Sequence, residues 1–427
     1  MKSNVLVFPA GEINSIELHE ALSNNVNINV FGASSVDRHG PFIFKNYHSG
    51  LPFITQDNFI NEFNQLIDAW HIDFVFPTHD TVALFLAENS KMIHAVIMGA
   101  DAQSALICRN KRKTYDLFSE YSFCPEVYSE FSTFPCFIKP TEGQGGVGAK
   151  TIKSKEDIPI NVNLDDYIIS EYLPGEELTV DCITDFHGVL KAVLPRSRDR
   201  IMAGVCVSGE TKKPIAEITK IAEVINRKLQ FLGLWYFQLK KDNTGNYKLL
   251  EVSSRCAGTM CLSRARGVNL PLLSVYVAQG KEITVFENDI TVKVDRTLIS
   301  RYNIGYSYET VYIDYDDTVV QGENVCLPVI RFLYQCKNQH KRIVLLTRHE
   351  TDHKDTVIQS LAAHAISSSL FDQIVILPLT VDKSDAITEK EAVFIDNSYQ
   401  ERLKVHNAKG IPVFDVEGIE VLTDWKS

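Results

Sequence analysis

The stretch 137-FIKPTEGQGGVGAKTI-152 places four glycines between two β-rich segments. Lys139 lies near the end of the first segment, and the loop contains Gly143, Gly145, Gly146 and Gly148. Because glycine tolerates positive φ angles and close backbone approach, the amides of such a loop can surround phosphate oxygens. A plain flexible hairpin is the alternative, since the loop does not match GxxxxGK[ST] and joins two strands, whereas a dinucleotide fingerprint opens a helix.

The composition describes an ordinary globular chain. Its 427 residues favour two to four domains, and 45% hydrophobic with 23% charged residues is typical of a chain with a real core. The formal net charge of −11 argues against a nucleic acid or a membrane surface as partner, because binding a polyanion requires a basic face.

The cysteines and the apolar runs indicate in which cellular compartment the protein is expected. There are nine cysteines without a repeated CxxC spacing, a pattern that favours reduced thiols over a disulfide framework or a zinc site. The apolar run near the N-terminus is too short for a signal peptide, and no run approaches the roughly 18 residues of a membrane span. We therefore expect a soluble, cytoplasmic protein.

Three regions differ in their pattern of predicted elements. Residues 1–105 alternate strand-like and helix-like segments, which predicts an α/β domain with a parallel sheet. Residues 106–300 read as paired antiparallel strands with one long amphipathic helix over 214–233, an α+β pattern. After a connector, residues 305–427 return to α/β alternation. Ligands of parallel sheets bind at the carboxyl ends of strands, where Thr78, His79 and Asp80 fall.

The motifs around the glycine loop occur in a recognisable order. Lys111 begins a helix upstream, and IISEYLPGEELTVD, LPRSRDRIMAG and FQLKKDNTGNYKLLEVSSR follow downstream. This series resembles the ATP-grasp superfamily, in particular the branch of carbamoyl-phosphate synthetase and amino-acid ligases. The resemblance covers about residues 1–300 and implies a pre-ATP-grasp domain over 1–105 and an ATP-grasp domain over 106–300.

The resemblance implies a role for each matching residue. ATP phosphates would be bound by Lys111, Lys139 and the loop glycines; adenine would lie along Glu171 and Leu173; and Glu177 would bind the ribose. Mg²⁺, with Mn²⁺ as an alternative, would be held by Gln238 and Glu251, and Arg255 would hold the transferred phosphoryl group. Arg196, Arg198 and Asp80 are candidates for the substrate, although arginines at strand ends are often plain salt-bridge partners.

One position departs from the family pattern. Where the family usually has ExNPR, this chain has 251-EVSSR-255, so Ser253 replaces the asparagine that helps to bind a second magnesium. A serine hydroxyl is a weaker oxygen donor. Two consequences of this replacement stay open, namely weaker metal binding and a changed acceptor of the phosphoryl group.

A second cluster of charge lies at 314-DYDDT-318, directly after an apolar strand. An Asp-rich turn is the alternative to a site, but crowded carboxylates point to a cation or phosphate chemistry that compensates them. With Thr347, Lys383 and Asp396 following at later strand ends, residues 305–427 resemble the haloacid dehalogenase (HAD) superfamily.

This second resemblance implies a Rossmannoid HAD-like domain with a phosphatase site. Asp314 would be the nucleophile and Asp316 the general acid/base. Thr347 and Lys383 would stabilise the phosphoryl group, and magnesium would be held by Asp314, Asp316 and Asp396. The short spacings between these residues leave no room for a large cap domain.

Together the motifs predict an ATP-dependent carboxylate–amine ligase that works through an acyl phosphate, fused to a magnesium-dependent phosphatase acting on a phosphorylated substrate or product. The alternatives are that the first part is a small-molecule kinase or an impaired nucleotide-sensing module. The expected partners are a small carboxylate and a nucleophile, and a homodimer is an assembly to test. The sequence does not identify these small molecules.

Overall fold

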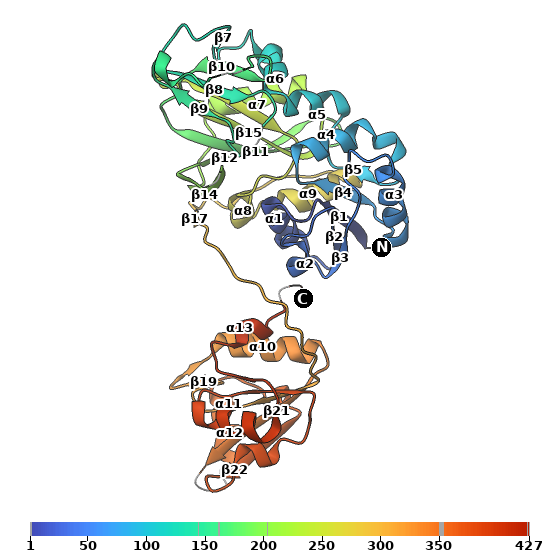
Figure 1. Cartoon of the computed structure of the whole chain (residues 1–427), viewed down its shortest axis with the longest axis vertical. Helices are drawn as coiled ribbons and strands as arrows, with labels where there is room; N and C mark the ends of the chain where they lie inside the picture. Colours follow the sequence, from blue (N-terminus) through green and yellow to red (C-terminus); the bar gives the residue numbers. More distant parts are fainter. Residues whose placement is uncertain are drawn as a thin grey trace. The chain divides into compact units, whose positions relative to one another are not determined.

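A computed structural model describes residues 2–143, 145–160, 163–202, 204–349, 354–424 and 426. The chain divides into two compact units, Met1–Leu298 and Ile299–Ser427, drawn in blue to yellow-orange and in orange to red (Figure 1). The finer boundary between 1–105 and 106–300 stays a prediction. Among the described residues, none of the helices has the length and apolar character needed to cross a membrane.

The first unit begins with a parallel sheet of order β3-β2-β1-β4-β5, as the alternating pattern predicted. Its strands are β1 (Ser3–Phe8), β2 (Ile28–Ser34), β3 (Asn46–Ser49), β4 (Phe74–Pro77) and β5 (Val96–Ile97). The run Val5–Phe8 is apolar throughout because side chains on both faces of β1 enter hydrophobic cores. The helices of this region are α1 (Ile13–Leu22), α2 (Gly40–Ile43), α3 (Phe59–Trp70) and α4 (Asp80–Glu88).

Two antiparallel sheets form the middle of the first unit. One has the order β7-β10-β8-β9, with β7 (Val127–Tyr128), β8 (Cys136–Pro140), β9 (Lys150–Ile152) and β10 (Tyr167–Glu171). The other has the order β12-β11-β15-β16, with β11 (Glu177–Thr184), β12 (Leu190–Ser197), β15 (Phe231–Lys241) and β16 (Tyr247–Ser253). A short strand, β6 (Gly99–Ala100), also pairs with β15, and α5 (Ala102–Arg109) and α6 (Lys111–Phe118) lead into the first of these sheets.

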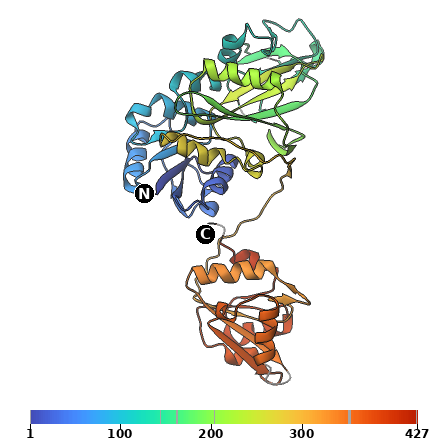
Figure 2. The ribbon, with the colours of Figure 1, turned by 180° about the vertical axis from the view of Figure 1, so that it is seen from behind.

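The amphipathic helix α7 (Ala216–Lys228) is shorter than predicted. Its buried residues Ile218, Ile221 and Ile225 follow helical spacing and pack on the sheet with Trp235 and Phe237, and Figure 2 shows α7 in yellow-green over the green strands. Over residues 229–233 the burial alternates with a period of two, so the chain continues as β15 and the helix does not reach residue 233.

The first unit ends with a small sheet and two helices. Strands β13 (Arg200–Met202), β14 (Val205–Glu210) and β17 (Lys293–Asp295) pair antiparallel in the order β13-β14-β17. Between β16 and β17 lie α8 (Cys261–Ala265) and α9 (Leu270–Ala278), and α9 packs in the same core as the N-terminal parallel sheet.

The second unit is a parallel sheet of order β22-β21-β18-β23-β24 covered by helices. Its strands are β18 (Thr310–Ile313), β21 (Arg342–His349), β22 (Gln373–Pro378), β23 (Ala392–Ile395) and β24 (Val413–Phe414). The helices are α10 (Leu327–Asn338), α11 (Lys354–Ala363), α12 (Tyr399–Lys409) and α13 (Ile419–Leu422). Between β18 and α10 the chain forms only a short hairpin, β19 (Val320–Gln321) with β20 (Asn324–Val325), which is too small to be a cap domain.

Candidate functional sites

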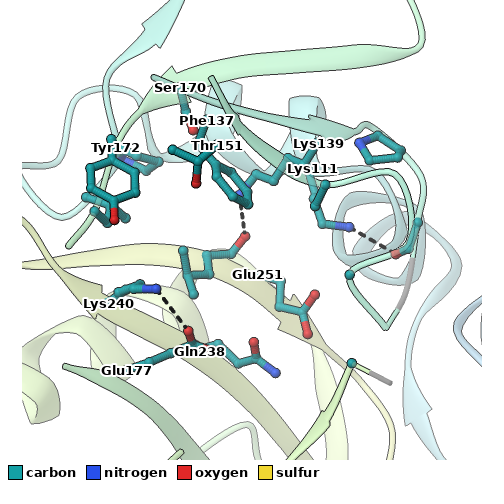
Figure 3. A pocket seen from close by; sticks show the side chains of 18 of the residues that line it. Lys111, Phe137, Lys139, Thr151, Ser170, Tyr172, Glu177, Gln238, Lys240 and Glu251 are labelled. Atoms are coloured by element: carbon teal, nitrogen blue, oxygen red, sulfur yellow. Dashed lines mark hydrogen bonds and ion pairs between the residues drawn. The ribbon is translucent and has the colours of Figure 1, made fainter. Parts of the chain in front are cut away.

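A cavity of about 370 Å³ opens between the two antiparallel sheets of the first unit (Figure 3). Strands β8, β9 and β10 supply one wall, and β11, β15 and β16 supply the other. The structure brings most of the predicted nucleotide and metal residues to this cavity: Lys111, Lys139, Gly143, Gly145, Gly146, Glu171, Leu173, Glu177, Gln238 and Glu251. The substrate candidate Arg198 also lines it.

Two lysines form the basic end of the cavity. Lys139 is buried, and its Nζ donates to the Tyr115 hydroxyl and lies 4.9 Å from the centre of that ring. Burial, and after it the positive charge of Lys111, lower the pKa of Lys139 to about 7. Lys111 Nζ donates to the Gly143 carbonyl at 3.0 Å. The negative charge of an anion that enters here would favour the charged, ammonium form of Lys139.

The glycine loop has backbone angles that favour glycine. Gly145, Gly146 and Gly148 have φ angles of 62°, 69° and 77°, in the left-handed region. A Cβ atom on Gly148 would lie 2.9 Å from Cγ of Pro140, so this position also lacks space for a side chain. Gly148 itself does not line the cavity, and Gly204, from the turn between β13 and β14, approaches the backbone of Gly145 closely.

Apolar side chains and a charged triplet also line the cavity. Phe137, Tyr172 and Leu250 line it beside the predicted adenine residues. Glu177 accepts from Arg198 Nε at 2.7 Å and pairs with Lys240 Nζ at 3.4 Å. Apolar walls together with a carboxylate held by two basic groups suit a base and the hydroxyls of its sugar.

Gln238 and Glu251 lie directly opposite each other on β15 and β16. Both side chains are half-buried at the cavity, and neither forms a hydrogen bond or ion pair within the part of the chain that the structure describes. Carboxylate and amide oxygens suit magnesium, which is often bound by one or two protein groups plus phosphates and water. The residues therefore fit such an ion, although the described residues contain no group of three or more His, Cys, Asp or Glu placed to hold a metal.

Asp80, Ser253 and Arg255 form a separate polar cluster that does not line the cavity. Arg255 donates to both carboxylate oxygens of Asp80 at 2.9 and 2.8 Å, and the Ser253 hydroxyl donates to the same carboxylate at 2.8 Å. Burial alone would raise the pKa of Asp80, but the Arg255 guanidinium and these bonds lower it to about 2. The placement of Ser253 does not support its predicted role as a metal ligand, because its hydroxyl already serves Asp80.

Arg196 requires a correction. Its side chain is buried within the sheet, where it donates to both oxygens of Asp181 at 2.8 and 3.0 Å and also to Thr259. A guanidinium that is fully paired in the interior is not placed to hold a substrate, whereas Arg198, two residues later, does reach the cavity.

Two residues that line the cavity were not predicted, although their spacing in the sequence relates each of them to a predicted residue. Tyr115 follows Lys111 by four residues in α6, a spacing that places both on one face of the helix. Lys240 follows Gln238 by two residues in β15, so their side chains share one face of the sheet.

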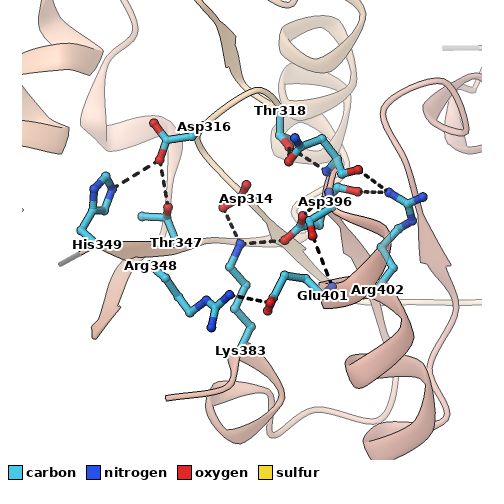
Figure 4. Close-up of polar contacts among 12 residues, drawn as sticks. Asp314, Asp316, Thr318, Thr347, Arg348, His349, Lys383, Asp396, Glu401 and Arg402 are labelled. Atoms are coloured by element: carbon cyan, nitrogen blue, oxygen red, sulfur yellow. Dashed lines mark hydrogen bonds and ion pairs between the residues drawn. The ribbon is translucent and has the colours of Figure 1, made fainter. Parts of the chain in front are cut away.

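The second unit gathers its predicted residues at the carboxyl end of its sheet (Figure 4). Asp314 follows β18 and Asp396 follows β23, and the ammonium of Lys383 lies between them, 2.6 Å from the first carboxylate and 2.7 Å from the second. Burial raises the pKa of Asp314 above its usual range, and the positive charge of Lys383 opposes that shift. Lys383 begins the short helical turn Lys383–Ala386.

Asp316 points toward the end of β21. Its Oδ2 accepts from the Thr347 hydroxyl at 3.5 Å and lies 3.5 Å from Nε2 of His349, a residue that sequence reasoning missed. Asp317 has a φ angle of 56°, so the chain turns sharply after Asp316. Two buried carboxylates that share one lysine carry a net negative charge, and their hard oxygens fit a magnesium ion bound with water and phosphate.

Comparisons with known proteins bear on the first unit. A family model described as "ATP-grasp in the biosynthetic pathway with Ter operon" matches residues 163–298. The first unit contains an ATP-grasp domain. No curated protein sequence matches the chain.

Solved structures share this fold at low sequence identity. A Rhizobium etli pyruvate carboxylase has a TM-score of 0.54 at 15% identity over 66% of this chain, which spans only 29% of that longer protein. An L-amino acid ligase from Bacillus licheniformis has a TM-score of 0.51 at 14% identity, covering 65% of this chain and 74% of its own. The biotin carboxylase domain of a Hydrogenobacter thermophilus 2-oxoglutarate carboxylase, solved with MgADP, ADP and bicarbonate, has a TM-score of 0.53 at 14% identity, covering 68% of this chain and 72% of its own.

Proposed function

We propose that the first unit is an ATP-dependent ligase that joins a carboxylate to an amine. One observation carries the proposal: a single cavity has Lys111, Lys139 and the glycine loop on one wall and Gln238 with Glu251 on the other. The ATP-grasp domain supports a nucleotide in this cavity, and the similar folds include an amino-acid ligase and an ADP-bound carboxylase domain.

Each wall has a distinct task in the proposed reaction. Lys139 and Lys111 bind the phosphates, while Glu177 holds the ribose and the apolar residues hold the base. Gln238 and Glu251 would hold magnesium, which would supply positive charge to compensate the transferred phosphoryl group. The amine then attacks the acyl phosphate, a C–N bond forms, and the C–O bond to phosphate breaks with release of inorganic phosphate.

Arg255 is the residue proposed to hold the transferred phosphoryl group. In the structure its guanidinium is paired with Asp80, so the arginine must exchange a carboxylate partner for a phosphate as the reaction proceeds. This exchange keeps the buried charge of Arg255 compensated at both stages.

A nucleotide-sensing module is the second candidate. The observation that favours it is Ser253, which stands where the family uses asparagine and whose hydroxyl is bonded to Asp80. The two candidates differ in turnover. A ligase releases ADP only when a carboxylate and an amine are added, and Glu251→Gln should lower that release by about 10²-fold, the cost of one lost electrostatic contact in the transition state. A sensing module binds the nucleotide without such turnover.

We also propose that the second unit is a magnesium-dependent phosphatase of the HAD type. The observation that carries this proposal is the placement of Asp314, Lys383 and Asp396 at one end of a parallel sheet, with Asp316 and Thr347 beside them. An Asp314 oxygen attacks phosphorus and forms an aspartyl-phosphate, and the bond from phosphorus to the ester oxygen breaks. Asp316 gives its proton to that leaving oxygen, then accepts a proton from the water that releases inorganic phosphate.

The two proposed reactions are linked by their chemistry. Ligation through an acyl phosphate leaves any phosphate ester on the substrate untouched, so a phosphatase on the same chain has use if the ligase substrate or product is such an ester. The test offers phosphorylated and unphosphorylated forms of an identified ligase substrate or product to the full-length protein. Hydrolysis of neither phosphorylated form faster than a generic ester would contradict the link.

A further inference from the structure

His349 lies beside the carboxylate that the proposed phosphatase uses as its acid (Figure 4). Its Nε2 is 3.5 Å from Asp316 Oδ2, and the same oxygen is 3.5 Å from the Thr347 hydroxyl. The Asp316 side chain is 59% exposed, whereas that of His349 is only 23% exposed. The better-buried imidazole therefore lies, with Thr347, beside a carboxylate that is largely exposed to solvent.

The strands explain why His349 reaches this position. β18 ends at Ile313, opposite Leu345 of β21, and β21 continues for four more residues beside the Asp314–Asp317 segment. β22 supports this extension, since Thr347 pairs with Ile376 and His349 with Pro378. Alternate residues of a strand share one face, so Thr347 and His349 lie on the side of Asp316.

The side chain of Arg348, between these two residues, lies on the opposite face of the strand. It forms an ion pair with Glu401 at 2.5 Å and donates to the Leu379 carbonyl at 3.1 Å. Because the strand is paired with β22 and the intervening arginine forms an ion pair with α12, the backbone that carries His349 is fixed by the fold.

We propose that His349 is a positioning residue that holds the Asp316 carboxyl toward the leaving oxygen of the ester. The inference rests on the proposed phosphatase function. In that reaction Thr347 engages the phosphoryl group and exchanges its contact with Asp316 for one with phosphate. Among the described side chains, His349 is then the neighbour left to restrain Asp316 while its proton moves to the oxygen whose bond to phosphorus breaks.

The inference makes a specific kinetic prediction because ester oxygens differ in their need for that proton. An alkoxide is a strong base and leaves only when it is protonated, whereas p-nitrophenolate is stable enough to leave without a proton. Loss of positioning should therefore slow an alkyl phosphate much more than an aryl phosphate. A general structural defect would slow both to the same extent.

The experiment compares full-length wild type, His349→Ala, His349→Gln and the control His406→Ala, which removes an exposed imidazole of α12. Ethyl phosphate and p-nitrophenyl phosphate are the substrates, with magnesium present. For His349→Ala we expect kcat on ethyl phosphate to fall by about 10 to 10²-fold, within the typical contribution of general acid catalysis, and kcat on the aryl ester to change little. His349→Gln, whose amide can donate to Asp316, should recover part of the loss.

Three results would overturn the inference. Equal losses on both esters would show that His349 acts only on structure, and no loss on either would show that Asp316 needs no such support. If the wild type hydrolyses neither ester and matches Asp314→Asn, the proposed phosphatase function fails and the inference fails with it. The first two results leave the wild-type activity intact, so they are distinguishable from the third.

Discussion

Nucleotide binding to the first unit should take up a proton at Lys139. In the free protein this lysine is buried next to Lys111, and its pKa is about 7, against 10.5 for an ordinary lysine. At pH 8 about nine-tenths of the protein therefore has a neutral Lys139. The triphosphate supplies negative charge at this position, which favours the ammonium and raises the pKa in the complex.

The sign and size of the effect follow directly. Above pH 7 the complex holds more protons than the free protein, so binding weakens as the pH rises. The penalty of charging Lys139 is about 1.4 kcal/mol at pH 8 and grows by the same amount for each further pH unit, until the pKa of the complex is reached. We therefore expect the Kd for a non-hydrolysable ATP analogue with magnesium to rise roughly tenfold per pH unit above pH 8.

Calorimetry measures the proton directly. Titrations at pH 8 in buffers of different ionisation enthalpy should give an uptake of about 0.9 proton per nucleotide, because the terminal phosphate is already ionised there. Lys139→Met should abolish the uptake and weaken binding, whereas the control Lys153→Met, at an exposed position, should leave it unchanged. No uptake by the wild type, or the same uptake by Lys139→Met, would refute the reasoning.

Three further predictions concern the ion pairs, the two sites and the glycine loop. Asp181→Asn leaves the buried Arg196 without its charge partner and should lower the free energy of unfolding by about 3–5 kcal/mol in urea titrations. The control Arg200→Ala breaks the exposed pair with Asp295 and should lower it by less than about 1 kcal/mol. Equal effects would contradict this account of Arg196. Asp314→Asn should abolish ester hydrolysis and leave ADP release unchanged, since each unit contains the residues of its own site; loss of both activities in a folded protein would show that the sites are coupled. Gly148→Ala places a side chain on a backbone of left-handed conformation and directs it toward Pro140. Nucleotide affinity measured by calorimetry should therefore fall by about tenfold. Unchanged affinity would show that binding does not need this loop geometry.

Local patterns predicted much of the fold and which residues the structure brings together at each candidate site. The alternation of strand-like and helix-like segments over residues 1–105 predicted the parallel sheet, and polar residues after apolar strands located Asp314, Thr347 and Asp396 at one sheet edge. The sequence predicted that Lys139 and the glycine loop lie close together, because both belong to one strand–loop–strand segment. These features depend on residues close together in the sequence.

The pairings that the sequence did not predict join separate segments of the chain. Arg196 and Arg198 look alike in the sequence, but Asp181, from the adjacent strand β11, pairs with the first and Glu177 with the second. Ser253 and Arg255 lie next to the predicted magnesium residues, yet Asp80, from the N-terminal part of the unit, binds both. A single sequence does not show which buried carboxylate meets which basic side chain, because that depends on strand pairing and packing.

The measurement that tests the central claim most directly is trapping of the acyl phosphate. A panel of amino acids and other small carboxylates is offered with ATP, magnesium and hydroxylamine to the Asp314→Asn protein, in which the second site should be inactive. We predict that at least one carboxylate gives hydroxamate and ADP in equal amounts, and that adding Glu251→Gln lowers both by about 10²-fold. ADP formation without hydroxamate, or near-normal yields after Glu251→Gln, would contradict the account of the first unit as a ligase.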